Sequence, residues 1–304
     1  MSAKKKRRRK QKNWFGFIST LGKNSTLKVM LLSTITVGLY VSILLLLSEH
    51  LIDDFKITTT VHSILGITLG LMLVIRTNTA NDRWWEGRKL VGGMVNSSRN
   101  LALKLSTLLD VTDKVTRERF AHIISNYAFA LKEHLREGVD FKEIEGFDKD
   151  TIDKLHRLFH IPNGIAEMLM IEINKLYKNK QIDGYQLINM DKQAESFTDI
   201  VGACERIKRS PLPIVYGTHL KLFIFVYVLT LPFGLIHELH YFTIPAVMLV
   251  FYAMAGIEII GEEIEDPFGM DENDIPMDAI CITIRNNVFE ILVDNQVVTP
   301  QIEH

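Results

Sequence analysis

One stretch of the chain joins an uncharged apolar half to a strongly charged half: VHSILGITLGLMLVIRTNTANDRWWEGR, residues 61–88. Residues 61–75 contain no formal charge, and charged residues then recur from Arg76 to Arg88. A lipid bilayer accepts an uncharged helical run, because a helix satisfies its backbone hydrogen bonds internally. The stretch therefore predicts a membrane helix that continues into a polar stalk outside the bilayer.

A stripe of aliphatic side chains runs along the apolar half of this stretch. Ile67, Leu71 and Ile75 are spaced four residues apart, so they share one face of a helix. Gly66 and Gly70 lie beside the stripe, and small residues at this spacing let membrane helices approach closely. We interpret the stripe as the constriction of a pore. The alternative is an ordinary lipid-facing or packing surface.

Three further apolar windows occupy residues 29–48, 220–236 and 242–260. The first matches the roughly 20 residues that span a hydrocarbon core. Together with the opening stretch they predict four transmembrane helices, an even number that leaves both chain termini on one side. A basic arm precedes the first window, and the positive-inside rule places such an arm in the cytoplasm. We expect a multi-pass protein of the plasma (inner) membrane with cytoplasmic N- and C-termini.

The basic arm also suggests a partner. A dense basic run can bind nucleic acid, but Trp14 and Phe15 and then a long apolar window follow this one directly. We therefore expect the arm to bind anionic membrane lipids and not nucleic acid. Its cations are Lys4, Lys5, Lys6, Arg7, Arg8, Arg9, Lys10 and Lys12.

The composition divides the chain into five parts: a basic arm (1–28), two membrane helices (29–79), a helical cytosolic domain (80–217), two further membrane helices (218–260) and an acidic C-terminal segment (261–304). Residues 80–217 alternate apolar and charged positions at helical spacing, so the fold class is an all-α membrane protein. Asp113 and Asp150 occupy expected N-cap positions, and a break at 160–164 precedes a helix expected over 165–178. The cysteines, Cys204 and Cys281, are expected to be reduced thiols.

Carboxylates crowd the segment that follows the last apolar window. Hard oxygen ligands at this density suit calcium, although their spacing does not match an EF-hand loop. The alternative is a solvated acidic turn that pairs with nearby arginines. The candidate ligands are Asp266, Asp271, Glu272 and Asp274.

Catalytic motifs are scarce in the sequence. The run His237-Glu-Leu-His240 is one residue short of the zinc-protease motif, and Gly22-Lys23 lacks the rest of a phosphate-binding loop. Neither a GxSxG nor a CxxC motif occurs. We therefore expect that the protein is not an enzyme and requires no cofactor. Calcium, suggested by the acidic segment, is the one possible ligand of this kind.

Three separated motifs resemble the bestrophin family, with the closest similarity to its bacterial branch. They are RTNTANDRWWEGRK at 76–89, CER at 204–206 with PLPIVY at 211–216, and EDPFG at 265–269. The resemblance covers roughly residues 20 to 290. It implies a homopentamer, a ring of five identical subunits around one axial pore that the second membrane helix of each subunit lines.

The resemblance also assigns roles to residues. The hydrophobic neck of the family matches Ile67, Leu71 and Ile75, where other members often carry aromatic residues. A second constriction at the cytosolic exit matches Ile182 or Tyr185. The calcium-binding acids of its animal members match the run after Pro267-Phe-Gly, which Met270 and Asn273 interrupt here.

The family default is the conduction of small monovalent ions, and of anions, chloride first. A monovalent cation (sodium) channel of the same architecture is an alternative, because an apolar neck discriminates little by charge. Two alternatives belong to other classes: a transporter, which would need broken helices in the membrane, and a membrane-anchored helical scaffold without conduction.

Overall fold

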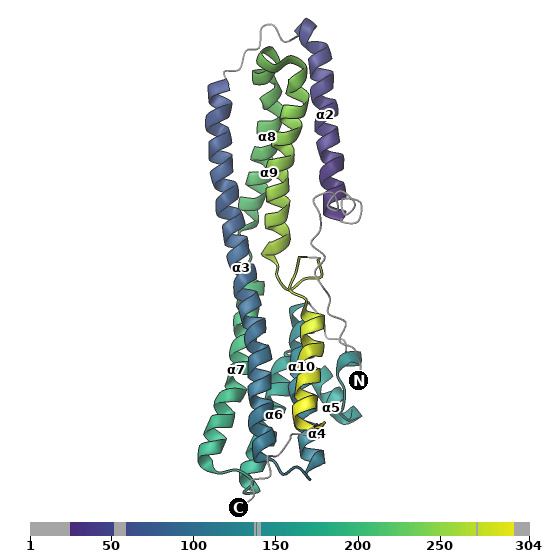
Figure 1. Ribbon diagram of the computed structural model, residues 1–304, viewed down its shortest axis with the longest axis vertical. Coiled ribbons are helices and arrows are strands. Elements are labelled where there is room, and N and C mark those ends of the chain that lie inside the picture. The colour runs from purple at the N-terminus through teal and green to yellow at the C-terminus, as the bar shows by residue number, and fades with distance from the viewer. Residues whose placement is uncertain (1–24, 52–58, 137, 139–140, 272, 295–304) are drawn as a thin grey trace, which may run out of the picture. The chain divides into compact units, whose positions relative to one another are not determined.

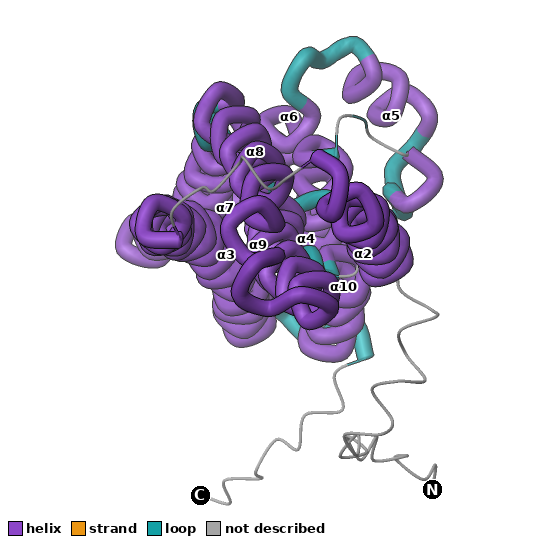
Figure 2. Tube along the Cα trace, turned by 90° about the horizontal axis from the view of Figure 1, so that it is seen from above, coloured by secondary structure: helices purple, strands orange, loops and turns teal. Residues whose placement is uncertain are grey.

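A computed structural model describes residues 25–51, 59–136, 138, 141–271 and 273–294. Over these residues the secondary structure is helical, with loops and turns between the helices and no strand (Figure 2). The chain forms two compact units, which we call the span unit (Met1–Thr79 and Leu212–Glu262) and the bundle unit (Ala80–Pro211 and Glu263–His304). The basic arm from Lys4 to Lys12 lies outside the described residues.

The span unit is built from the apolar windows of the sequence. It contains α2 (Ser25–Leu51), the first part of α3 (Thr59–Leu108), α8 (Ile214–Leu239) and most of α9 (Thr243–Glu265) (Figure 1). Three helical stretches are long and apolar enough to cross a membrane: Lys28–Leu47, Thr59–Leu108 and Ile214–Glu265. The third comprises α8 and α9, which the short 3₁₀ helix η2 (His240–Phe242) separates. These windows fold as helices because a helix leaves no backbone group unsatisfied in lipid.

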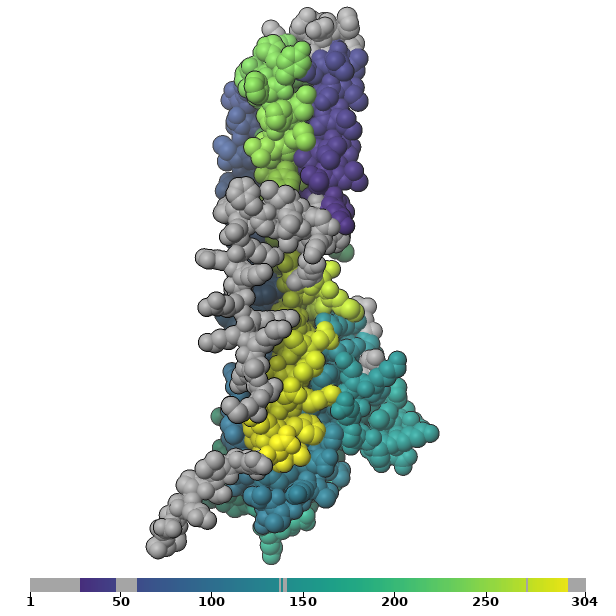
Figure 3. Space-filling model, turned by 45° about the vertical axis from the view of Figure 1, so that its right-hand side comes forward, coloured from purple at the N-terminus to yellow at the C-terminus, as the bar shows by residue number. Residues whose placement is uncertain are grey.

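Small residues let the helices of the span unit approach one another. A Cβ atom at Gly38 of α2 would lie 2.7 Å from the sulfur of Met248 on α9, and one at Gly66 of α3 would lie 2.8 Å from the hydroxyl of Tyr227 on α8. A Cβ atom at Gly70 would have no atom of another helix or side chain within 4 Å. Of the two glycines beside the aliphatic stripe, Gly66 therefore serves helix packing within the chain. The space-filling view shows α2 and α9 side by side (Figure 3).

The bundle unit contains the second part of α3 together with α4 (Lys114–Leu135), the 3₁₀ helix η1 (Phe141–Glu143), α5 (Lys149–His156), α6 (Ile161–Lys178), α7 (Gly184–Arg209) and α10 (Met277–Leu292). Its core is formed by buried apolar side chains from all its α-helices, and Tyr127 packs edge-on against Phe197 at a centroid distance of 5.1 Å. Helix α10 packs along α4. We predicted no helix in this segment, which we described only by its acidic residues.

The helix boundaries confirm one expected cap and correct two other expectations. The side chain of Asp113 accepts a hydrogen bond from the backbone of α4, as an N-cap should. At α5 the cap is Asp148 and not Asp150, which lies inside the first turn. Helix α6 begins at Ile161 and not at residue 165, because His160 caps it and Pro162 is tolerated in the first turn, where its missing N–H is not needed.

Two groups of polar side chains are buried in the bundle unit. Cys204 and Cys281 are free and buried, and burial raises the pKa of each thiol to about 12. The ammonium of Lys132 contacts the carboxylates of Glu133, Glu143 and Asp278. Burial alone would lower the pKa of Lys132, but hydrogen bonds to these carboxylates raise it above its usual value, so the lysine stays charged.

Candidate functional site

The aliphatic stripe lies on the open face of α3 in the span unit. Ile67, Leu71 and Ile75 are 67%, 61% and 60% exposed in the single chain. The opposite face of the helix is buried, and Leu69 and Leu73 pack there in the core of the span unit. The sequence therefore divides α3 into a face that packs within the chain and an apolar face that is left for lipid, another copy of the chain or an aqueous path.

A buried ion pair lies where the charges of α3 begin. Arg76 Nη2 lies 3.6 Å from Glu258 Oε1 of α9, and the two side chains are 5% and 4% exposed. Lys221 of α8 lies 3.8 Å from the same oxygen and pairs with Glu262 at 2.7 Å. A Cβ atom at Gly217 would lie 2.6 Å from Arg76 Nη1, so only a glycine leaves room for the guanidinium there. Buried ionisable groups are costly unless they are paired, and this pair lies where the uncharged part of α3 ends.

The contacts of the RTNTANDRWWEGRK motif in the bundle unit show what two of its side chains do. Arg83 donates to the carbonyl of Glu265 at 3.1 Å, to that of Ile207 at 2.8 Å and to that of Ser210. These carbonyls lie at the carboxyl ends of α9 and α7, where backbone acceptors lack partners within the helix. Trp84 Nε1 donates to the carbonyl of Asn273 at 3.0 Å. The motif thus joins the ends of two helices and the acidic segment.

Packing brings the EDPFG motif to the same place. A Cβ atom at Gly87 would lie 3.1 Å from Phe268 Cζ and 3.2 Å from Pro267 Cγ. Phe268 is fully buried in the bundle core. The motifs at 76–89 and 265–269 therefore share contacts around Arg83 and Gly87, and Arg83 also holds Ile207 and Ser210, which lie between the motif parts at 204–206 and 211–216.

The acidic candidates for calcium are partly engaged by the protein itself. Asp266 Oδ2 accepts from Lys208 at 2.6 Å, and Asp274 Oδ2 accepts from the backbone of Asp271 at 2.7 Å. Asp274 Oδ1 is buried without a hydrogen-bond partner, and burial raises the pKa of this carboxyl. Glu272 lies outside the described residues. An orphaned carboxylate oxygen is compatible with a cation ligand, whereas the lysine on Asp266 competes with one.

The two candidates for the cytosolic constriction differ in exposure. Ile182 is 5% exposed and packs in the bundle core just before α7. Tyr185 is 83% exposed in the first turn of α7, which begins with a capping box formed by Asp183 and Gln186. Of the two, Tyr185 is the one that presents its side chain outside the core of the single chain.

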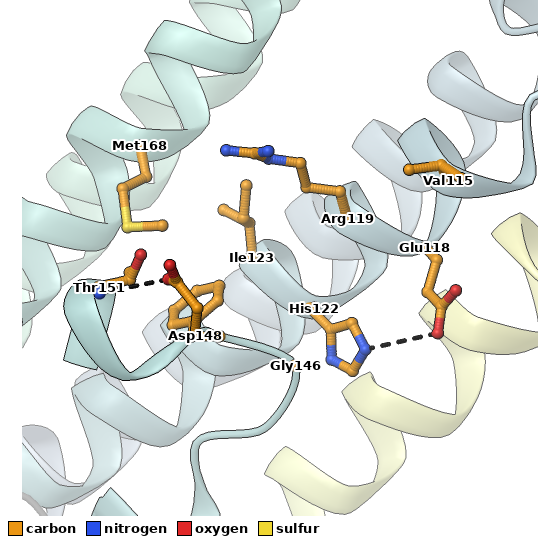
Figure 4. Close-up of a pocket in the computed structure, with 10 residues that line it drawn as sticks. Val115, Glu118, Arg119, His122, Ile123, Gly146, Asp148, Thr151 and Met168 are labelled. Atoms are coloured by element: carbon orange, nitrogen blue, oxygen red, sulfur yellow. Dashed lines mark hydrogen bonds and ion pairs between the residues drawn. The ribbon is translucent and has the colours of Figure 1, made fainter.

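A hollow of about 470 Å³ lies between α4, α5 and α6 of the bundle unit (Figure 4). The charged groups on its wall have partners: Glu118 lies 3.9 Å from His122, Arg119 pairs with a carboxylate of α6 at 2.7 Å, and Asp148 caps α5. Gly146 adopts φ +76° directly against the ring of His122, where no larger residue would fit. Among the described residues, these charged groups on the wall are therefore each engaged by another group of the protein.

Sequence reasoning missed several polar residues that the fold brings together. Glu258 was hidden in an apolar window, although a lone carboxylate within a predicted span is itself a signal. His134, His160 and Glu205 come from three different helical segments and converge in the bundle unit. The second group has no motif in sequence, because its members are far apart along the chain.

Comparison with known proteins identifies the family. The family model for bacterial and fungal bestrophin proteins matches residues 5–290. A voltage-dependent anion channel-forming protein of Nostoc sp. is 37% identical over 230 residues, 74% of this chain and 75% of that protein. One of Synechocystis sp. is 37% identical over 231 residues, 75% of each chain. The crystal structure of a bacterial bestrophin homologue from Klebsiella pneumoniae shares the fold, with a TM-score of 0.80 and 24% identity over 88% of this chain and 98% of that one. The predicted resemblance is confirmed: the chain belongs to the bacterial and fungal bestrophin family.

Proposed function

We propose that this chain is the subunit of a homopentameric channel for small monovalent anions, chloride first, in the plasma membrane. The family membership and the names of the Nostoc and Synechocystis relatives support a channel-forming protein and not an enzyme. In this proposal α2, the apolar part of α3, α8 and α9 are four transmembrane helices. The bundle unit and both termini are cytoplasmic, and the basic arm lies on anionic lipid.

The observation that carries the proposal is the open aliphatic face of α3. Ile67, Leu71 and Ile75 extend away from the packed face of α3, which leaves them available to face an axis when copies of the chain assemble. Rings of apolar side chains exclude water when they lie close together and pass ions when they part. A neck of this kind needs no charged gate, and Tyr185 is our candidate for the second constriction.

The sign of the conducted ion depends on charge outside the neck, because an apolar ring discriminates little between chloride and sodium. The names of the relatives favour the anion. Flux from purified protein in liposomes, with chloride and sodium gradients set separately, decides between the two. Chloride-driven flux supports the proposal, sodium-driven flux supports the cation alternative, and no flux at all supports the scaffold.

The neck is tested with paired variants. Replacing Ile67 and Leu71 by alanine should widen the constriction and raise the flux several-fold. Leu39 of α2 is a matched control, because it is 61% exposed, as Leu71 is. Leu39→Ala should leave the flux unchanged. Equal flux from wild type and the double variant would exclude these residues as the neck.

Calcium is proposed as a ligand of the acidic segment, held by Asp274 with Asp266, Asp271 and Glu272. The buried, unpartnered oxygen of Asp274 supports it. A calcium titration of the liposome flux should then change the open probability in the micromolar range. A flat response over that range, with the flux otherwise intact, would remove calcium from the proposal.

A further inference from the structure

Three side chains converge on one point in the bundle unit. His134 near the end of α4, His160 at the start of α6 and Glu205 in α7 place one ligand atom each within 4.8 Å of one another. Nε2 of His134 lies 2.6 Å from Glu205 Oε1, and Nε2 of His160 lies 3.0 Å from the same oxygen. The two imidazole rings are 4.4 Å apart between centroids. One carboxylate oxygen is therefore shared by two histidines.

The three elements that carry these residues hold them in place. α4, α6 and α7 pack against one another, and the residues around the cluster belong to the bundle core. The side chains of His134, His160 and Glu205 are 18%, 19% and 19% exposed. The cluster is thus fixed by buried helices on one side and remains accessible to a small ion from solvent on the other.

We propose that His134, His160 and Glu205 form a binding site for a divalent transition metal, zinc being the ion that fits best. Two imidazole nitrogens and one carboxylate oxygen are a common zinc donor set, with the fourth position left to water. Calcium and magnesium prefer all-oxygen sites, so the two nitrogens select against them. The site is separate from the acidic segment proposed for calcium and does not depend on the channel proposal.

The geometry requires little movement. Ligand bonds of about 2.0–2.1 Å in a tetrahedral site place neighbouring ligand atoms about 3.3 Å apart. The nitrogen–oxygen distances of 2.6 and 3.0 Å are those of hydrogen bonds, so the two distances need to lengthen by about 0.7 and about 0.3 Å. Rotations of the two rings and of the glutamate side chain are sufficient for this.

Two neighbouring groups compete with the metal and set its affinity. Arg209 Nη2 lies 3.3 Å from Glu205 Oε1, but its side chain is 66% exposed and can turn into water. The backbone N–H of Asn163 donates to Nδ1 of His160 at 3.2 Å, so the ring proton of neutral His160 lies on Nε2. Metal binding at Nε2 moves that proton to Nδ1, which can then no longer accept from the N–H of Asn163, so binding weakens the α6 cap and this cost lowers the affinity.

The test uses the full chain in detergent, stripped with EDTA and titrated with zinc chloride by calorimetry. Wild type should bind one zinc per chain at this site in a saturable step. Cobalt(II) in its place should give the visible absorption of a tetrahedral site. Glu205→Gln preserves the shape of the side chain and an oxygen acceptor, and it should weaken zinc binding at least tenfold. His134→Ala should do the same.

The matched control is His156→Ala. His156 stacks on Phe141 at a centroid distance of 3.7 Å and lies outside the cluster, so its loss should leave zinc binding unchanged. Circular dichroism and gel filtration establish that each variant folds. The proposal is overturned if folded, stripped wild type shows no saturable step, or if Glu205→Gln and His134→Ala bind zinc as wild type does.

Discussion

Arg83 should control the carboxyl ends of α7 and α9 in the bundle unit. Its guanidinium donates to three carbonyls, those of Ile207, Ser210 and Glu265. A net contribution of about 1 kcal/mol for each bond is reasonable, because all three are partly open to water. In Arg83→Gln the side chain is shorter and keeps a single amide donor group. The variant should therefore lose about two of the three hydrogen bonds, or about 2 kcal/mol of local stability.

The assay is amide hydrogen exchange of the protein in detergent, followed by mass spectrometry of peptides that cover the last turns of α7 and α9. A local loss of about 2 kcal/mol corresponds to exchange roughly 30-fold faster in both turns, since about 1.4 kcal/mol is tenfold. Exchange in α4 should not change. Global unfolding is a poorer readout, because a chain of two units need not unfold in one step.

Arg119→Gln is the control for loss of a guanidinium elsewhere. Arg119 lies on α4, and its partner Glu172 keeps a second cation, Lys175 at 2.7 Å. This variant should leave exchange at the ends of α7 and α9 as in wild type. If Arg83→Gln changes exchange in those turns by less than threefold, the three bonds do not stabilise the helix ends and the reasoning fails.

Three further predictions concern the bundle unit. Gly87→Ala should lower the thermal midpoint of unfolding, because the EDPFG motif would crowd the added methyl group. Gly92→Ala in the same helix has open space around it and should raise the midpoint, because alanine favours the helix more than glycine does. The opposite order of the two midpoints in a melting assay would contradict this. Hydrogen bonding to Lys132 lowers the pKa of Asp278 in the folded state. The ionised Asp278 therefore stabilises the fold fully above about pH 4, and this stabilisation is lost as the pH falls through the lowered pKa. Asp278→Asn should flatten the acid limb of the curve of unfolding free energy against pH, and an unchanged limb would refute the prediction. Both cysteine thiols should resist maleimide at pH 8 until the protein is unfolded, because each is buried with a pKa of about 12; rapid labelling of the folded chain would show that they are accessible.

Local patterns were enough to predict the helices other than α10 (Met277–Leu292), because each is encoded within its own segment. The uncharged windows became helices of the span unit, and the residues after Arg76 continued as the same helix to Leu108. That continuity could be read from the helical spacing that persists beyond the change in polarity. Helix boundaries were harder to predict. Asp148 and Asp150 are equally suitable N-cap residues by type, and in the structure Asp148 is the one that caps α5.

Tertiary contacts decided what the sequence could not reveal. Glu205 lies 71 residues from His134 and 45 from His160 along the chain, so no local spacing marks the cluster. The ion pair between Arg76 and Glu258 depends in the same way on α3 and α9 lying against each other. The neck residues differ from both, since their spacing in one helix was sufficient to place them on one face.

An exposed apolar face has a different meaning in the span unit than it would in water. Lipid is as apolar as leucine, so the exposure of Leu71 on α3 and of Leu39 on α2 carries no penalty in a bilayer, and it supplies no hydrophobic drive for assembly. The two leucines are equally exposed in the single chain, so any difference between them must arise from where assembly places each helix. Leu71→Ala and Leu39→Ala should therefore have similar small effects on stability in lipid while only the first changes conduction. Equal effects on conduction would mean that α3 meets lipid and not the pore.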